Sequence, residues 1–190
     1  ILDVWYGGSE AADAIIDVIY GKVNPSGKLT MTFPRNVGQI PIYYNMKVGG
    51  RPAKTDSYKR FSSCYIDSPN SPLYPFGYGL SYTSFEYSDF VLSAEKMDAC
   101  GSVKASVTVT NTGKYDGDET VQLYIHDPVA KMMRPLRELK AFEKVMIKKG
   151  EKATVTLELG AKELGYYTPE GEFTVETGKV AELANAECIC

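Results

Sequence analysis

Residues that commonly bind metals and cofactors are scarce in this chain. The 190 residues include one His, one Trp and four Cys. The cysteines have no metal-ligand spacing, and the one Cys-x-Cys pair lies at the extreme terminus. We therefore expect no metal and no cofactor, and we interpret the cysteines as free thiols or at most one disulfide. The four positions are Cys64, Cys100, Cys188 and Cys190.

Strong net charge and long apolar runs are also missing. The formal net charge is −3 at pH 7, with 24% charged residues. This balance gives no reason to expect nucleic acid or an anionic membrane as a partner. No apolar run reaches the roughly 18 residues that a membrane-spanning helix needs, so we expect no membrane span.

The beginning of the chain lacks a methionine and a charged lead-in. Ile1–Trp5 is instead apolar enough for the middle of a buried parallel strand. We expect the chain to be a piece of something longer. Missing targeting signals then say nothing about the compartment.

Residues 1–33 have a mixed helix and strand pattern. Ser9 is a fair N-cap for a helix over Glu10–Tyr20, whose apolar residues line one side and which Gly21 ends. A short alternating strand is expected at Leu29–Phe33. A strand, a glycine turn and a helix make half of a βαβ unit.

Two segments without regular periodicity follow. Residues 34–72 are dense in Pro, Gly, Asn and Ser, and such long loops are often functional or disordered; their tyrosines argue against disorder. Residues 71–88 combine two prolines, two glycines and six aromatic rings, so they predict an ordered connector that turns several times.

After the connector the apolar period becomes two. The alternating positions predict six or seven short strands, which indicates a β-sandwich of immunoglobulin or fibronectin-III type. A final hairpin is expected over 164–168 and 173–177, whereas 181–187 looks helical or frayed. The clearest positions are Phe85, Tyr87 and, after a shift in the period, Phe90 and Leu92; Val103 to Val109; Val121, Leu123 and Ile125; Leu139 to Ile147; and Val155, Leu157 and Leu159.

The connector also resembles a known family. Leu-Tyr-Pro-Phe-Gly-Tyr-Gly-Leu-Ser-Tyr-Thr-x-Phe, over 73–85, is similar to the segment of family 3 glycoside hydrolases that joins their α/β sandwich domain to a fibronectin-III-like domain. Asn-Pro-Ser-Gly-Lys-Leu at 24–29, Gly-Arg-Pro at 50–52 and Val-Thr-Asn-Thr-Gly at 109–113 agree with it in order.

The resemblance implies a mainly β fold in two parts. Residues 1–80 are expected to be the C-terminal remnant of an α/β sandwich domain with a long loop, and residues 81–190 a fibronectin-III-like β-sandwich. The longer protein would be a retaining hydrolase of terminal β-linked glucose or xylose in oligosaccharides. It would be periplasmic or secreted, and a homodimer of it is one partner hypothesis.

The resemblance places no catalytic residue in this chain. Retaining hydrolysis needs two carboxyl groups about 5 to 5.5 Å apart. The family's nucleophile and acid/base belong to regions before residue 1, so the chain alone is expected to be inactive. A β-glucoside or oligosaccharide would meet it only together with the missing domains.

Four residues are the candidates for substrate binding. Trp5 lies at the expected carboxyl end of a strand, where α/β sheets place ligands. By resemblance, Arg51, Arg60 and Tyr65 lie in a loop that runs toward the active-site mouth and shapes the outer sugar subsites. Cys64 stands where relatives usually have Arg or Lys, and packing is an alternative role for each candidate.

Other polar residues fit structural roles better. His126 ends an expected strand, which favours a surface or turn role over a catalytic triad. Glu10 suits the start of the helix because an acidic residue complements the helix dipole there. Asp116, Asp118 and Glu119 lack calcium-loop spacing and indicate a solvated hairpin tip.

A second function class stays open. A stand-alone β-sandwich for carbohydrate binding or for interaction would account for 80–178, but it leaves the βα unit and the Asn-Pro-Ser-Gly-Lys-Leu segment unexplained. One strand and one helix bury little surface, so residues 1–80 are expected to depend on the sandwich for order.

Overall fold

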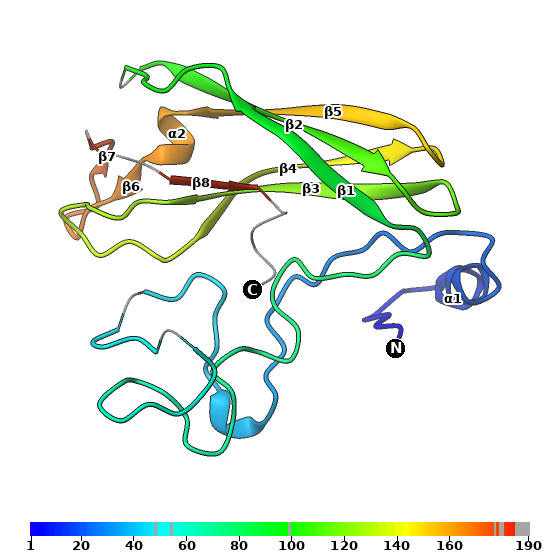
Figure 1. Ribbon diagram of the computed structural model, residues 1–190, viewed down its shortest axis with the longest axis horizontal. Coiled ribbons are helices and arrows are strands. Elements are labelled where there is room, and N and C mark those ends of the chain that lie inside the picture. Colours follow the sequence, from blue (N-terminus) through cyan, green and yellow to red (C-terminus); the bar gives the residue numbers. More distant parts are fainter. Residues whose placement is uncertain (48, 54, 99, 177, 179–180, 185–190) are drawn as a thin grey trace.

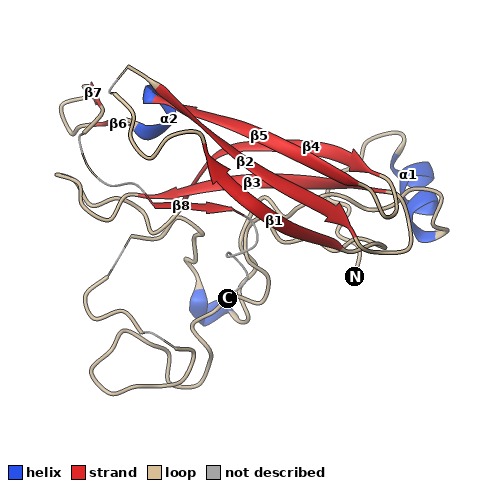
Figure 2. Ribbon diagram, turned by 45° about the horizontal axis from the view of Figure 1, so that its top comes forward, coloured by secondary structure: helices blue, strands red, loops and turns tan. Residues whose placement is uncertain are grey.

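Two layers of strands form the larger part of the molecule, and an irregular region lies below them (Figure 1). The computed structural model describes residues 1–47, 49–53, 55–98, 100–176 and 178, and the backbone of 181–184. The described strands all follow residue 84, while loops and two helical segments make up residues 1–84; Figure 2 distinguishes the strands from the loops by colour.

The two layers are antiparallel three-stranded sheets. The first has the order β1-β2-β5 and the second the order β4-β3-β8. A two-stranded hairpin, β6 and β7, follows the short helix α2. The bounds are β1 Phe85–Leu92, β2 Ser102–Asn111, β3 Gly117–His126, β4 Glu138–Ile147, β5 Lys152–Gly160, α2 Ala161–Leu164, β6 Tyr166–Tyr167, β7 Phe173–Thr174 and β8 Ala181–Ala184.

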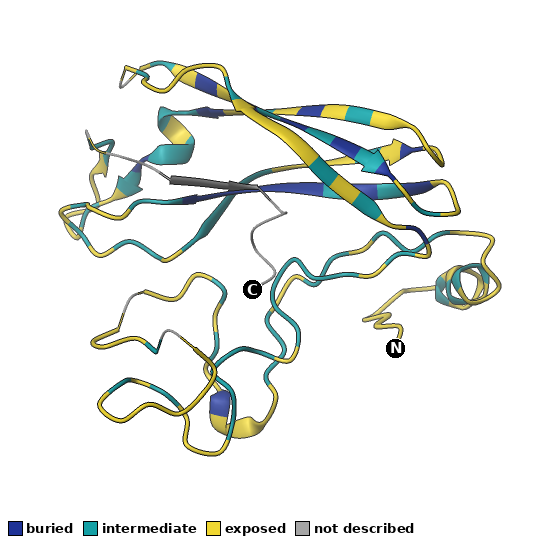
Figure 3. Cartoon of the chain, in the orientation of Figure 1, coloured by how far each residue is buried: buried dark blue, intermediate teal, exposed yellow. Residues whose placement is uncertain are grey.

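The core lies between the sheets and follows the predicted alternation. Every second residue of β2 is buried, and Leu123 and Ile125 of β3 meet Leu159 of β5 across the layer. Figure 3 shows the buried positions concentrated on these strands. Each such side chain contributes about 1.5–3 kcal/mol on burial. The predicted β-sandwich and its final hairpin are therefore confirmed.

Strand β1 contains the predicted shift in its pattern. Its register against β2 changes between Ser88 and Val91, and Asp89 has a left-handed φ of 53°. Phe85 and Tyr87 pack on the core before this bulge and Leu92 does so after it. Phe90 sits on the bulge and stays 40% exposed.

The prediction of a helical or frayed segment near the C-terminus is wrong for residues 181–184. They form β8, which pairs with β3 from Leu123 to His126. The free edge of β3 offers backbone hydrogen bonds that outweigh the helix propensity of an Ala-Glu-Leu-Ala sequence. Residues 185–187 lie outside the part that the structure describes.

The predicted buried strand at Ile1–Trp5 is also wrong. Residues 1–8 form no strand, and Ile1 to Tyr6 are all exposed. A parallel strand needs neighbours on both sides, and no described strand lies beside this segment. Apolar composition alone therefore did not produce a strand here.

The predicted helix is present as α1, Ala11–Ile19. Its N-cap is Glu10 rather than Ser9, and no side chain caps it, so the Ser9 prediction is wrong. Gly21, with φ +72°, ends the helix as expected by donating to the carbonyl of Val18 at 3.0 Å.

The segment predicted as a strand at Leu29–Phe33 pairs with the connector instead of with a sheet. Leu29 donates to Tyr78 O at 2.8 Å and accepts from Gly77 N at 2.7 Å. Phe33 and Tyr74 form an isolated antiparallel bridge. The tyrosine-rich connector is therefore ordered, as predicted, because its backbone is paired along this segment.

Lys28 joins the first part of the chain to the sandwich. Its Nζ lies 3.0 and 3.1 Å from the two carboxylate oxygens of Glu119, and Tyr87 donates its hydroxyl hydrogen to Glu119 Oε1 at 2.8 Å. Glu119 is only 5% exposed. The predicted solvated hairpin tip is thus wrong for Glu119, whose side chain is buried because a cation from residues 1–80 covers it.

A second contact lies on the outer face of β3. Gln122 donates to Gly77 O at 3.2 Å and accepts from the Tyr124 hydroxyl at 2.6 Å. The Tyr44 ring stacks on Phe76 at 4.1 Å and meets Tyr124 edge-on at 6.2 Å. Both Gln122 and Tyr124 are buried, so the connector and the sandwich share one packed interface.

Candidate substrate-binding loop

Gln39 organises the long loop between the helix and the connector. It ends a 3₁₀ turn, Val37–Gln39, and is 1% exposed. The side-chain oxygen Oε1 accepts a hydrogen bond from Arg35 N at 2.6 Å. The side-chain nitrogen Nε2 donates to Pro69 O at 2.9 Å and to Ser71 O at 3.2 Å. A polar side chain that is buried and fully bonded fixes both ends of residues 35–71.

Asp56 fastens the second half of the loop. Its carboxylate accepts from Ser71 N at 2.8 Å and from Ser71 Oγ at 2.6 Å. The hydrogen bond from the Ser71 hydroxyl, followed by the one from its amide, lowers the pKa of Asp56. Nearby, the side-chain oxygen of Asn70 accepts a hydrogen bond from Tyr65 N at 3.0 Å.

This fastening should be lost in acid. An aspartate with a lowered pKa gives its stabilisation in full above its ordinary value, about 3.9, and loses it as the pH falls through the lowered value. An NMR titration of the Ser71 amide should show a midpoint below about 3.9. The variant Asp56→Asn should show no such midpoint, and a midpoint above the ordinary aspartate value in the wild type would contradict the assignment.

Arg51 lies where the loop closes on itself. Ser63 donates its amide to Arg51 O at 2.8 Å and its hydroxyl to Gly50 O at 2.7 Å, and Pro52 forms a bridge with Ser63. Arg51 has a left-handed φ of 55° and an exposed side chain. Non-glycine residues with a left-handed backbone store strain, and such residues cluster at functional sites.

Arg60 lies over the ring of its neighbour Phe61, 4.8 Å from the ring centroid. Phe61 is 72% exposed and also has a left-handed φ, 66°. Tyr65 is partly exposed, and its hydroxyl donates to Gln39 O at 3.4 Å. Cys64 is a free thiol close to Lys59 O.

Trp5 belongs to a different part of the molecule. Its ring lies 6.2 Å from Phe33, which contacts Tyr74, and Tyr74 stacks on Tyr78. Figure 1 shows the N-terminal segment beside α1, apart from the cyan loop. Within the described residues, no hydrogen bond or ring contact joins any two of the four candidate side chains.

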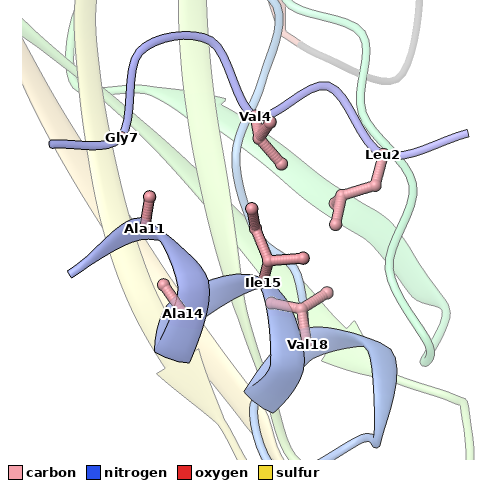
Figure 4. A pocket seen from close by; sticks show the side chains of 7 residues that line it. All are labelled: Leu2, Val4, Gly7, Ala11, Ala14, Ile15 and Val18. Atoms are coloured by element: carbon pink, nitrogen blue, oxygen red, sulfur yellow. The ribbon is translucent and has the colours of Figure 1, made fainter. Parts of the chain in front are cut away.

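An apolar hollow of about 210 Å³ separates the N-terminal segment from α1. Figure 4 shows Leu2 and Val4 facing Ile15 and Val18 across it. Only apolar residues and one glycine line it. Without a polar group to orient a sugar, this hollow is a packing surface and not a reaction site.

The remaining polar candidates take structural positions. His126 is the last residue of β3, and its Nδ1 lies 3.3 Å from Pro135 O. In the described part of the chain, no group of three or more His, Cys, Asp or Glu could hold a metal ion. No helix among the described residues is long and apolar enough to cross a membrane.

Two known family models match separate parts of the chain. The glycosyl hydrolase family 3 C-terminal domain matches residues 1–82, and a fibronectin type III-like domain matches residues 119–184. The chain belongs to glycosyl hydrolase family 3.

Family 3 relatives match nearly all of this chain. A periplasmic β-glucosidase of Salmonella typhimurium is 47% identical over 94% of the chain, and a β-xylosidase of Formosa agariphila is 46% identical over 94%. The crystal structure of a β-glucosidase from Listeria innocua in complex with gluconolactone superposes with a TM-score of 0.88, at 40% identity over 96% of the chain. The chain spans about a quarter of each: 23%, 24% and 25% of their lengths.

The sequence interpretation missed the residues that hold the family 3 loop in place. Gln39 and Asp56 were not selected as candidates, because their burial or bonding depends on partners about thirty and fifteen residues away. Phe61 was missed because nothing in its neighbourhood indicates a left-handed backbone. The density of Pro, Gly and Ser did locate the loop itself.

Proposed function

We propose that this chain is the C-terminal portion of a retaining glycoside hydrolase that removes terminal β-linked glucose or xylose from oligosaccharides. The observation that carries the proposal is the 47% identity with a periplasmic β-glucosidase, which spans 94% of this chain but only 23% of that protein. The catalytic pair of carboxyl groups would then lie in the part of the longer protein that corresponds to the unmatched three quarters of the relatives.

Two of the chain's carboxylates have structural partners. Glu119 is paired with Lys28, and Asp56 is held by Ser71. Both carboxylates therefore serve structure. The nucleophile and the acid/base belong to the preceding domains, and this chain alone should be inactive.

The loop is proposed to bind the outer sugar units. Arg51, Arg60 and Tyr65 supply donors and one ring, and the exposed ring of Phe61 adds a stacking surface. The left-handed backbone at Arg51 and Phe61 agrees with a functional loop. Trp5 is proposed to act separately, at the edge of the α/β domain.

The organisation of the whole protein is also a proposal. Residues 1–80 would complete an α/β domain, and residues 81–190 would form the fibronectin-III-like domain. A periplasmic or secreted location is supported by the name of one relative. A homodimer remains the partner hypothesis.

A stand-alone carbohydrate-binding or interaction module is the alternative. The pair between Lys28 and Glu119 argues against it, because a sandwich that acts alone would not need a cation from residues 1–80 to cover its Glu119 carboxylate.

The purified chain and the longer protein that contains it should be compared on an aryl β-glucoside. We expect turnover by the longer protein and none above background by the chain. Turnover by the chain alone would overturn the proposed division of work, and no turnover of β-glucosides or β-xylosides by the longer protein would overturn the proposed activity.

A further inference from the structure

The connection between β3 and β4, residues 127–137, touches the base of the candidate loop. Leu136 N donates to Met46 O at 2.8 Å, and Pro135 forms an antiparallel bridge with Lys47. These contacts lie just before the stretch that carries Arg51. Backbone groups of the sandwich therefore hold the part of the loop that leads to Arg51.

The same connection is anchored inside the sandwich by Arg134. The Arg134 side chain is 7% exposed, and its guanidinium lies 4.7 Å above the ring of Tyr166 in β6. Its Nη2 is 2.8 Å from Glu138 Oε1, which starts β4. A buried planar guanidinium held on two sides fixes the backbone of the adjacent Pro135.

Glu176 provides a second anchor for the connection. One of its oxygens accepts from Lys131 N at 2.9 Å and the other from the Tyr166 hydroxyl. The hydrogen bond from Tyr166 lowers the pKa of Glu176, so this carboxylate stays ionised at neutral pH. Residues 131 and 134 are thus both tied to the β6–β7 hairpin.

Tyr44 fixes the loop base from the other side. Its ring stacks on Phe76 of the connector and meets Tyr124 of β3 edge-on. The loop is therefore in contact with the sandwich or the connector at 44, 46 and 47 before it reaches Arg51.

We propose that the β3–β4 connection positions the substrate-binding loop, with Arg134 as the positioning residue. The sandwich then contributes to specificity for the outer units of a β-linked oligosaccharide without touching them. The effect on oligosaccharide specificity rests on the proposed function. The positioning of the loop by Arg134 does not, because it depends only on contacts within the chain.

The test uses the longer protein with Arg134→Met, and Lys131→Met as the matched control. Both variants remove one positive charge from the connection, but the Lys131 side chain is exposed and only its backbone bonds Glu176. In Arg134→Met, Glu138 keeps a partner, since Lys140 donates to it at 2.9 Å.

For a β-linked glucose trisaccharide, Arg134→Met should raise KM at least fivefold while kcat stays within twofold. KM for an aryl β-glucoside should stay within twofold, and the control should change neither.

Amide hydrogen exchange separates this inference from the proposed function. Residues 49–53 and 55–65 should exchange at least tenfold faster in Arg134→Met than in the wild type or the control. If the wild type hydrolyses no glycoside, the proposed function fails and the exchange rates still decide whether Arg134 positions the loop. Wild-type exchange rates or an unchanged trisaccharide KM in a folded variant would overturn the proposal. Arg134→Lys, which keeps the charge, carries the same test if the Met variant does not fold.

Discussion

Replacing Lys28 by Met should lower the free energy of unfolding by about 2–4 kcal/mol. The substitution keeps most of the side chain's volume but removes the ammonium group that lies 3.0 Å from Glu119. The Glu119 side chain, 7% exposed, would keep the hydrogen bond from Tyr87 but lose its cation. Breaking one side of a buried ion pair costs about 3–5 kcal/mol, and the 17% exposure of Lys28 reduces that range.

Denaturant unfolding measures this loss. The matched control is Lys22→Met, which removes a lysine from an ion pair with Asp17 whose side chains are 67% and 37% exposed, and it should cost less than about 1 kcal/mol. Adding Glu119→Gln to Lys28→Met should recover at least half of the loss, because a neutral amide needs no cation. Equal costs for the two lysines would show that the buried pair does not hold the two parts together.

Replacing Gly77 by Ala should be comparably damaging, at about 2–4 kcal/mol. Gly77 has a φ of +79°, which residues with a side chain adopt only with strain. A Cβ there would lie 2.4 Å from Gln122 Oε1 and 2.7 Å from the Tyr124 hydroxyl oxygen. Those two atoms are hydrogen-bonded to each other in a buried interface, so neither can move away without losing a partner.

Gly150→Ala separates strain from crowding. Gly150 has nearly the same φ, +78°, but a Cβ there would meet nothing within 4 Å. The Gly150 substitution should therefore lower the free energy of unfolding only through backbone strain, by about 1–2 kcal/mol. Thermal unfolding of both variants gives the comparison, and a Gly77 variant no less stable than the Gly150 variant would refute the crowded interface.

The sandwich could be predicted from the sequence because each strand encodes its own buried face. In β2, apolar and polar residues alternate from Val103 to Val109, and a period of two has one structural meaning. The bulge in β1 was visible as a shift of that period. Such local patterns survive whatever neighbours surround them.

The misread segments depend on neighbours that the local sequence does not contain. Ile1–Trp5 has the composition of a buried strand, yet no described strand pairs with it. Ala181–Ala184 has helical composition, yet the open edge of β3 makes it a strand. In both cases the availability of a partner backbone outweighs propensity.

The candidate site was predictable in place but not in detail. Proline and glycine density located the loop, and the family resemblance selected Arg51, Arg60 and Tyr65. The fixing contacts from Gln39 and Arg134 join residues far apart in sequence, and no spacing rule could reveal them. Trp5 was selected for its place after a strand that the structure does not contain.

The proposed hydrolysis with retention is tested most directly by proton NMR of the sugar that the longer protein first releases from a β-glucoside. The account predicts that the β-anomer appears first and that the α-anomer grows in only by mutarotation, with no release by the 190-residue chain alone. Initial release of the α-anomer, or no release by the longer protein, would contradict it.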